Sequence, residues 1–465
     1  MRLLSTFAAA LLLASSSITV MASEKPDAAS EGTLSQDHTY EPVAHINNGI
    51  DVGAGWLISG DIRAGWLQYG YDNPASAHFQ GPGDKYQKGN PDINKGHTDS
   101  QGFYVIPKIS ITTPMLSGFY AKVTGAAATD FGINDVNDES RNFVFDGNDR
   151  KSYAILQEAH VAFDANGNRV MIGAEELTTP MIDADDWYML ANTFQMAYYT
   201  NTMLEDNMFT VGYFYKMAGV WDSGANGTEY HSMSDASFVS QADKDNADDS
   251  GVITAVYQFN NNIHNFQVWN YYAEELYNTL FAQYDFTQKS GTFSYDFGLQ
   301  YIDFQEVGAL EENDFSHIDY SIYSARFDGG LESGFNFATG ISKYTDGEGQ
   351  NETLGAWGGY PYFANGMIFH FFEAGTLRNA ASYKAQFGYD IGDVHWLGVR
   401  YTGWDLDPEY SQTATGKPQD AMNMYGIRYS YNGKAGEYFT GTYEYVDLDN
   451  EPDIFALRLI GGVKF

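Results

Sequence analysis

The chain has 465 residues, a formal net charge of −36 and no cysteine. The lack of cysteine excludes disulfides, thiol catalysis and cysteine-ligated metals, and the negative charge argues against nucleic acid as a partner. An aromatic content of 16% argues against a disordered acidic chain. The 35 Tyr, 31 Phe and 48 Gly instead indicate many strands, interfacial aromatic belts and tight turns.

The first 22 residues have the pattern of a secretory signal peptide. Arg2 supplies the positive charge, residues 3–13 form the apolar run, and cleavage is expected after Ala22. A membrane anchor would need about 20 apolar residues, and this run is shorter and contains Ser and Thr. Residues 23–53 are polar and irregular, and we expect them to form a periplasmic lead-in to a folded domain spanning 54–465.

The folded part consists of segments in which apolar residues recur at every second position, the period of a strand and not of a helix. In the segment from Tyr425 to Tyr431, for example, aromatic and aliphatic residues share one face, while Arg428 and Ser430 lie on the other. No segment is long and apolar enough for a transmembrane helix. The pattern predicts eighteen strands, at 57–69, 102–112, 118–128, 152–163, 168–175, 193–201, 207–217, 251–259, 264–273, 277–286, 292–303, 317–327, 334–343, 381–391, 394–404, 421–431, 437–446 and 454–465.

The connections between these strands alternate in length. Short turns such as 392–393 alternate with long loops such as 344–380, with one short exception at 274–276. Short turns on one side and long loops on the other are typical of outer-membrane barrels, whereas a soluble sandwich has no reason to sort its loops this way. We therefore predict an all-β fold, a transmembrane antiparallel β-barrel of about 18 strands with short periplasmic turns and long extracellular loops.

The last strand displays both faces of such a wall. Leu457, Leu459 and Val463 occupy one face, and Arg458 and Lys464 occupy the other. A barrel in lipid must pair every backbone group by closing its sheet, and it turns its cations toward water. A closed cylinder of eighteen strands encloses an aqueous lumen, which indicates passage of solutes.

Several segments resemble an outer-membrane porin family of Gram-negative bacteria, the OprD type. They are the strand end and Thr-Pro loop at 172–183, the tight hairpin at 267–284, the Gly-Gly-Tyr-Pro-Tyr sequence at 358–362, and the closing Phe465, which resembles the signal read by the barrel assembly machinery. The resemblance covers most of 54–465. It implies a pore constricted by inward-folded loops, with a ladder of basic residues on its wall.

Carried over to this sequence, the resemblance assigns constriction residues to two loops. The third outer loop would supply Thr179, Pro180, Asp183, Asp185 and Asp186, and the seventh would supply Tyr360, Pro361 and Tyr362. Tyr360 stands where the family usually has Asp, so the charge carried by the seventh loop is left open.

Strand alternation by itself predicts which cations face inward. Arg169 and Lys464 also face inward but lie near strand ends. The other eight are assigned to a basic ladder on the pore wall: Arg63, Lys108, Lys122, Lys216, Lys384, Arg400, Arg428 and Arg458. One interpretation is an electrostatic track for carboxylates. The alternative is that these cations pair with wall acids such as Asp61, Glu158, Asp296, Asp390 and Glu444.

No enzymatic role is expected, because the chain has neither a Gly-x-Ser-x-Gly elbow nor a His-Glu-x-x-His zinc motif. No cofactor or metal site is assigned. The sequence predicts a passive outer-membrane porin for small hydrophilic solutes, biased to amino acids, peptides or small carboxylates. A general diffusion porin is the alternative, followed by a sheath barrel around a partner protein. Expected partners are membrane lipid and lipopolysaccharide, and the assembly machinery. Many porins associate as homotrimers, but no residue of this sequence marks an interface, so the oligomeric state is left open.

Overall fold

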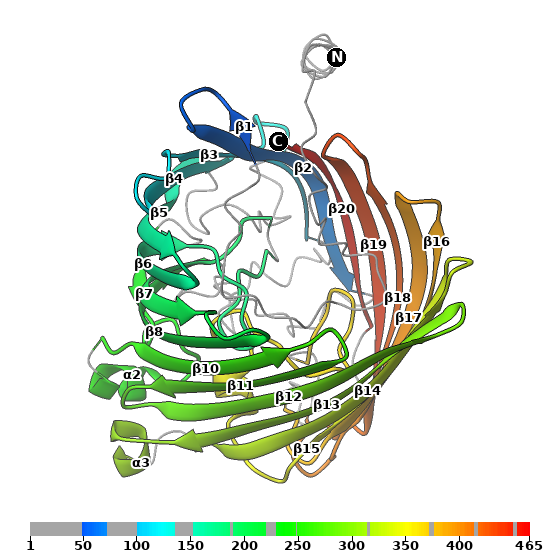
Figure 1. Ribbon diagram of the computed structural model, residues 1–465. Helices are drawn as coiled ribbons and strands as arrows, with labels where there is room; N and C mark the ends of the chain where they lie inside the picture. The colour runs from blue at the N-terminus through cyan, green and yellow to red at the C-terminus, as the bar shows by residue number, and fades with distance from the viewer. Residues whose placement is uncertain are drawn as a thin grey trace. The chain divides into compact units, whose positions relative to one another are not determined.

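The computed structural model describes residues 49–71, 100–134, 152–186, 189–219, 229–247, 249–313, 317–371, 376–412, 417–449 and 453–465. Eighteen long strands form one closed antiparallel barrel, which confirms the predicted fold class (Figure 1). The first nine are β2 (Leu57–Tyr71), β3 (Ser100–Thr112), β4 (Phe119–Ala128), β5 (Tyr153–Ala165), β6 (Asn168–Glu175), β7 (Thr193–Asn201), β8 (Asn207–Ala218), β10 (Val252–Asn260) and β11 (His264–Ala273). The other nine are β12 (Tyr277–Ser290), β13 (Phe293–Glu306), β14 (Asp319–Leu331), β15 (Phe335–Tyr344), β16 (Ala381–Ile391), β17 (His395–Asp405), β18 (Ala421–Asn432), β19 (Glu437–Leu448) and β20 (Ile454–Lys464).

The barrel closes where the first long strand meets the last. Strand β2 pairs with β20 from Asp61↔Lys464 to Tyr71↔Ile454. Beyond this ladder, Gly60 and Phe465 exchange two backbone hydrogen bonds of 2.8 and 3.0 Å. Closure leaves the sheet without a free edge, as a sheet in lipid requires.

The wall has an apolar outer face and a more polar inner face. Side chains such as Ile111, Val161 and Ile341 are exposed on the outside. Along β14, buried positions alternate with less buried ones from Tyr320 to Asp328, the period of two that the sequence shows. Among the described residues, no helix is long and apolar enough to cross a bilayer.

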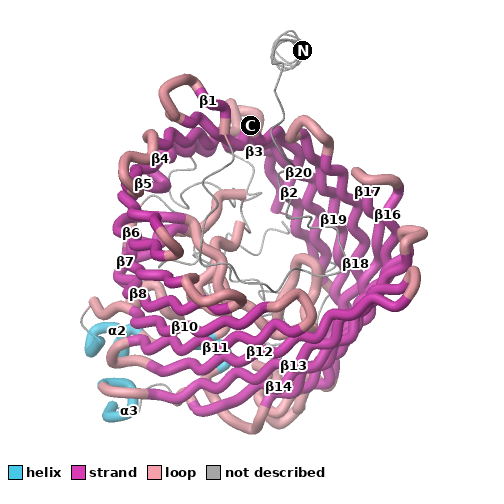
Figure 2. Tube along the Cα trace, viewed as in Figure 1, coloured by secondary structure: helices cyan, strands magenta, loops and turns pink. Residues whose placement is uncertain are grey.

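Two long loops fold into the barrel, and the strands of the wall surround them (Figure 2). We call residues 176–186 and 189–192 the third loop, and residues 345–371 and 376–380 the seventh loop. Leu177, Met181 and Ile182 of the third loop belong to one buried apolar cluster with Trp357 and Tyr362 of the seventh. Among the described residues, three short helices also lie in connections, α2 (Gln241–Ala247), α3 (Ala309–Asn313) and α4 (Gln350–Thr353).

Two short strands add to the prediction. Strand β1 (Ile50–Asp51) pairs with the start of β2, so the end of the expected lead-in takes part in the sheet. Strand β9 (His231–Ser232) pairs with the end of β8. The signal peptide predicted at 1–22 and the lead-in up to residue 48 lie outside the described residues.

Candidate functional site

The third and seventh loops meet inside the barrel. Ile182 and Gly358 form an antiparallel bridge, and the Asp183 N–H donates to the Trp357 carbonyl at 2.9 Å. Asn192 Nδ2 donates to the Asp183 carbonyl at 3.1 Å. Backbone contacts between the loops therefore fix their relative positions, and the two loops act as one inner structure.

Thr179 and Pro180 build the turn of the third loop. The Thr179 hydroxyl donates to the Ile182 carbonyl at 2.7 Å and accepts from the Ile182 N–H at 3.0 Å. Tyr271 on β11 donates its hydroxyl to Thr179 at 3.0 Å. Both Thr179 and Pro180 are buried, so they shape the loop and do not line open lumen, in contrast to what the family resemblance implies.

The acidic end of the third loop faces a basic wall. Arg63 Nη1 on β2 lies 2.7 Å from Asp186 Oδ2, and Arg63 Nη2 also donates to the Met189 carbonyl. Arg458 on β20 donates to the Asp186 carbonyl at 3.2 Å and lies 3.7 Å from its carboxylate. The Asp186 side chain remains 41% exposed, against 14% for Arg63 and 16% for Arg458, so water reaches this contact.

The acids of this loop differ in their electrostatic surroundings. Burial opposes ionisation of Asp186, but the charges of Arg63 and Arg458 outweigh it and lower the pKa of Asp186 to about 2. Burial raises the pKa of Asp183 to about 8, and the neighbouring Asp185 carboxylate adds to the shift. All three carboxyl groups are half-buried. At neutral pH the loop thus carries a fixed charge at Asp186 and a protonated carboxyl at Asp183.

Two ladder lysines pair with acids at the base of the third loop. Lys108 Nζ lies 2.8 Å from both carboxylate oxygens of Glu176. Lys122 Nζ lies 2.9 Å from Glu158, which also accepts from Thr124 at 2.5 Å. For these positions the structure agrees with the alternative interpretation, in which wall cations pair with acids.

Arg400 and Arg428 donate to the backbone of the seventh loop. Arg400 Nη1 donates to the Gly366 carbonyl at 2.8 Å, and Arg428 Nη2 donates to the Met367 carbonyl at 3.0 Å. Glu444 on β19 accepts from the next N–H groups of the same loop segment. These two arginines face inward as predicted, but some of their guanidinium N–H groups already donate to carbonyls of the loop.

Lys384 on β16 is a ladder cation that lies near both cations and an acid of the wall, namely Arg400, Arg326 and Asp328. Its side chain faces inward at 9% exposure, and no ion pair within 4.0 Å is formed with a described residue. The register row that contains Lys384 runs through Gly340 to Arg326. The wall between β14 and β17 therefore carries three cations, Arg326, Lys384 and Arg400, together with acids such as Asp328.

Arg326 on β14 is an inward cation that the sequence prediction missed. Its guanidinium lies 2.8 Å from Asp285, 2.6 Å from Asp296 and 2.7 Å from Asp328. Phe363 of the seventh loop packs over it, with 5.2 Å between the guanidinium carbon and the ring centroid. Alternation with the outward Ala325 and Phe327 contains the signal that would have identified it.

Lys216 does not lie where alternation predicts. It pairs with Gln195, whereas the next residue of β7, Met196, pairs with Phe214, so Tyr215 is an extra residue in the ladder. Buried positions along β8 accordingly pass from Phe214 to Met217, and Lys216 is exposed. A β-bulge of this kind reverses the faces beyond it. The assignment of Lys216 to the inner wall is therefore wrong.

The seventh-loop residues implied by the family resemblance also divide into two groups. The Tyr360 ring is half-buried and stacks on His370 with 3.9 Å between centroids. Pro361 is buried, with its carbonyl accepting from Gln300 at 2.7 Å. Tyr362 is 1% exposed and packs against Trp404. Pro361 and Tyr362 thus anchor the loop, and only Tyr360 retains a surface toward the lumen.

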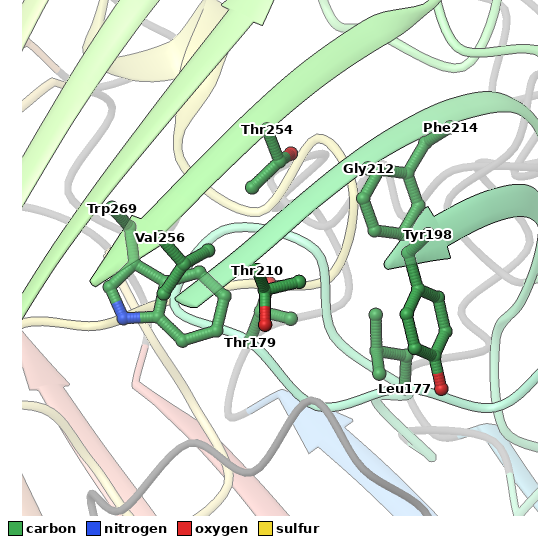
Figure 3. Close-up of a pocket in the computed structure, with 9 residues that line it drawn as sticks. All are labelled: Leu177, Thr179, Tyr198, Thr210, Gly212, Phe214, Thr254, Val256 and Trp269. Carbon is green, nitrogen blue, oxygen red and sulfur yellow. The ribbon is translucent and has the colours of Figure 1, made fainter. Parts of the chain in front are cut away.

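A small cavity lies behind the third loop, away from the basic wall. Leu177 and Thr179 face Tyr198, Thr210, Gly212, Phe214, Thr254, Val256 and Trp269 of β7, β8, β10 and β11 (Figure 3). Its lining carries no ionisable group other than Tyr198. The cavity separates the loop from the wall and is not the candidate solute site. Within the described ranges, no three His, Asp or Glu side chains gather in a way that could hold a metal ion.

Comparison with known proteins gives matches among solved structures only. No family model matches the sequence, and no curated protein matches it. OccK9 of Pseudomonas aeruginosa has a TM-score of 0.69 at 12% identity, over 88% of this chain and 98% of that chain. OccAB4 of Acinetobacter baumannii has a TM-score of 0.69 at 14% identity, over 88% of this chain and 97% of that chain. OpdK of Pseudomonas aeruginosa, solved with vanillate, has a TM-score of 0.65 at 14% identity, over 88% of this chain and 98% of that chain.

These similarities establish the fold. The chain has the eighteen-strand barrel architecture of OprD-type porins, as the sequence resemblance predicts. At these low sequence identities, the roles of individual residues cannot be transferred from the solved structures to this chain. The function below is therefore argued from the site.

Proposed function

We propose that this protein is a passive outer-membrane porin whose constriction favours zwitterions and small carboxylates. The observation that carries the proposal is the contact of Asp186 with Arg63 and Arg458, in which a loop carboxylate and two wall cations remain partly exposed to water. Opposite charges at one narrowing attract the two ends of a zwitterion, and low-dielectric walls focus their fields. Amino acids and peptides carry that pair of charges.

A bias toward carboxylates has a second support. Lys384 is an inward cation without an ion pair among the described residues, and Arg400 lies nearby. OpdK, which has the same fold, was solved with vanillate, an aromatic carboxylate. No energy source, cofactor or reaction is part of the mechanism, because diffusion through a water-filled constriction requires none.

The same proposal includes export and assembly. Residues 1–22 would direct secretion, and Phe465 would be read by the barrel assembly machinery. The Phe465 position at the closing seam supports this, because its backbone pairs with Gly60 and its ring fills the space above that glycine. Lipopolysaccharide and membrane lipid would contact the apolar outer face, and a homotrimer is the proposed assembly.

Planar-bilayer recording of the purified full chain tests the function. We expect stepwise single-channel conductance and saturable block of the ion current by amino acids and by benzoate-type carboxylates, with weaker block by neutral sugars of similar size. Equal, non-saturating effects of all three solutes would support a general diffusion porin instead. An absence of conductance from correctly folded protein would contradict any channel function.

A further inference from the structure

The contact between Glu444 and the seventh loop points to a residue that controls which wall cations a solute can reach. We propose that Glu444 is the positioning residue of residues 365–369, and that the docked loop keeps Arg400 and Arg428 on its own carbonyls. This inference deepens the proposed channel function and rests on it.

The docking contact is a carboxylate enclosed by consecutive backbone donors. The N–H of Met367 donates to Glu444 Oε1 at 2.7 Å, and the N–H groups of Ile368 and Phe369 donate to Oε2 at 2.6 and 2.8 Å. Glu444 is 0% exposed. Successive N–H groups of this kind form an anion-binding nest, which in this chain is filled by a side chain of its own wall.

The carbonyls of the same segment face the neighbouring arginines. Arg400 donates to Asn365 and Gly366, and Arg428 donates to Met367. Thr402 adds a hydrogen bond of 2.9 Å to the Asn365 carbonyl. The loop backbone is thus bound from both sides, with its donors on the acid and its acceptors on the cations.

The wall leaves room for this close approach. In register, Glu444 lies between Gly426 on β18 and Ala456 on β20. A Cβ on Gly366 would lie 2.4 Å from the Phe369 carbonyl oxygen, and a Cβ on Gly426 would lie 2.7 Å from Met367 Sδ. Small residues therefore surround the acid at the points where the loop backbone crosses it.

A carboxylate is the side chain that this nest requires. Three N–H groups donate, so both side-chain oxygens must accept. A Gln at this position would offer one oxygen and direct an NH₂ group at the remaining donors. Removal of Glu444 should therefore release the loop segment, after which Arg400 and Arg428 become available to permeating anions.

The absence of cysteine from the native chain allows a direct test of loop release. Ile368 is 2% exposed, so the thiol of Ile368→Cys should react slowly with a water-soluble maleimide in the folded barrel. Adding Glu444→Gln should speed this labelling at least about tenfold, the factor expected from the loss of a single charge-assisted hydrogen bond. Unchanged labelling in a barrel that retains its heat-dependent gel mobility would overturn the inference.

Bilayer recording gives the second measurement. Glu444→Gln should raise the conductance and shift the reversal potential toward anion selectivity by more than Asp390→Asn does. Asp390 on β16 is a matched control because its replacement removes the same charge from the wall, and it contacts Asn336, not the seventh loop. Equal shifts of the reversal potential in the two variants would contradict the release of the arginines. A native protein that does not conduct would contradict the channel function, but the labelling experiment would still test the docking of the loop.

A second variant guards against misfolding of Glu444→Gln. Gly366→Ala changes no charge, and its Cβ must displace the loop backbone. It should speed labelling of Ile368→Cys and raise conductance with a smaller change in selectivity, because Glu444 remains beside Arg400 and Arg428. Slow labelling in this variant would contradict the docking role.

Discussion

The Asp186 carboxylate lies 2.7 Å from Nη1 of Arg63, in an ion pair that joins residues 123 positions apart in the sequence. The pair connects the inward third loop to strand β2 on the wall. Because Arg458 also contacts Asp186, one loop carboxylate offsets two wall cations.

The first prediction concerns this carboxylate. Asp186→Asn should make the channel more anion-selective, because the charges of Arg63 and Arg458 lose their counterion. A unit charge at about 4 Å is worth about 1 kcal/mol in water, so the anion-to-cation permeability ratio should rise by about fivefold. The reversal potential in a salt gradient measures this ratio.

Asp206→Asn is the charge-matched control for Asp186→Asn. Asp206 is exposed in a turn with a positive φ of 62°, a conformation that Asn also adopts. The control should leave selectivity almost unchanged. Similar shifts from both variants would mean that overall charge, and not the loop contact, sets selectivity.

The second prediction is a pH dependence from Asp183, whose pKa is raised to about 8 by burial and by Asp185. Below that pH the carboxyl holds a proton, so raising the pH through about 8 adds a negative charge to the third loop. Anion permeability should therefore fall as pH rises. The reversal potential recorded from about pH 6 to about pH 9 should show one step, and Asp183→Asn should abolish it.

Asp186 does not contribute to this pH step. The pKa of Asp186 is lowered to about 2, so its charge stays constant through neutral pH. Ionisation of Asp183 also opposes docking of the third loop, because the folded state binds its proton more tightly than the unfolded chain does. A flat selectivity profile in the native protein would contradict the raised pKa of Asp183.

The third prediction concerns Arg326, which contacts Asp285, Asp296 and Asp328. Arg326→Met leaves three largely buried carboxylates without their cation, and breaking a buried pair in this way costs about 3–5 kcal/mol. Urea unfolding in lipid vesicles should show a clear loss of stability.

Lys289→Gln on strand β12, which is separated from β14 by β13, is the control for Arg326→Met. Its pair with Glu332 is 62% and 58% exposed, and exposed pairs are worth less than about 1 kcal/mol. The control should unfold nearly as the native protein does. Comparable losses from both variants would argue against the buried cluster as a source of stability.

The fourth prediction separates the two faces of the wall. Lys216→Gln should leave ion selectivity unchanged, because the bulge at Tyr215 turns Lys216 to the outer face. Arg458→Gln should reduce anion permeability, since Arg458 faces inward and contacts Asp186 of the third loop. A shift from Lys216→Gln as large as that from Arg458→Gln would require Lys216 to face the lumen.

The sequence alone determined the strands and most of their faces. Period-two alternation is a local property, because neighbouring residues of a strand point to opposite faces whatever the strand pairs with. It identified the strand at 381–391 to the residue, and it placed Arg63, Lys384, Arg400 and Arg458 on the inner face. The alternation of short turns and long loops likewise identified the closed barrel.

The tertiary structure decided what those inward residues do. The Asp186–Arg63 contact, the docking of residues 365–369 on Glu444 and the three acids around Arg326 join segments far apart in sequence. Such contacts depend on where loops enter the lumen, which no local pattern specifies. The reversal at Lys216 has the same origin, because a bulge is defined by the register with a partner strand. Local backbone geometry thus fixes sidedness, while charge pairing requires the closed barrel to bring its partners together.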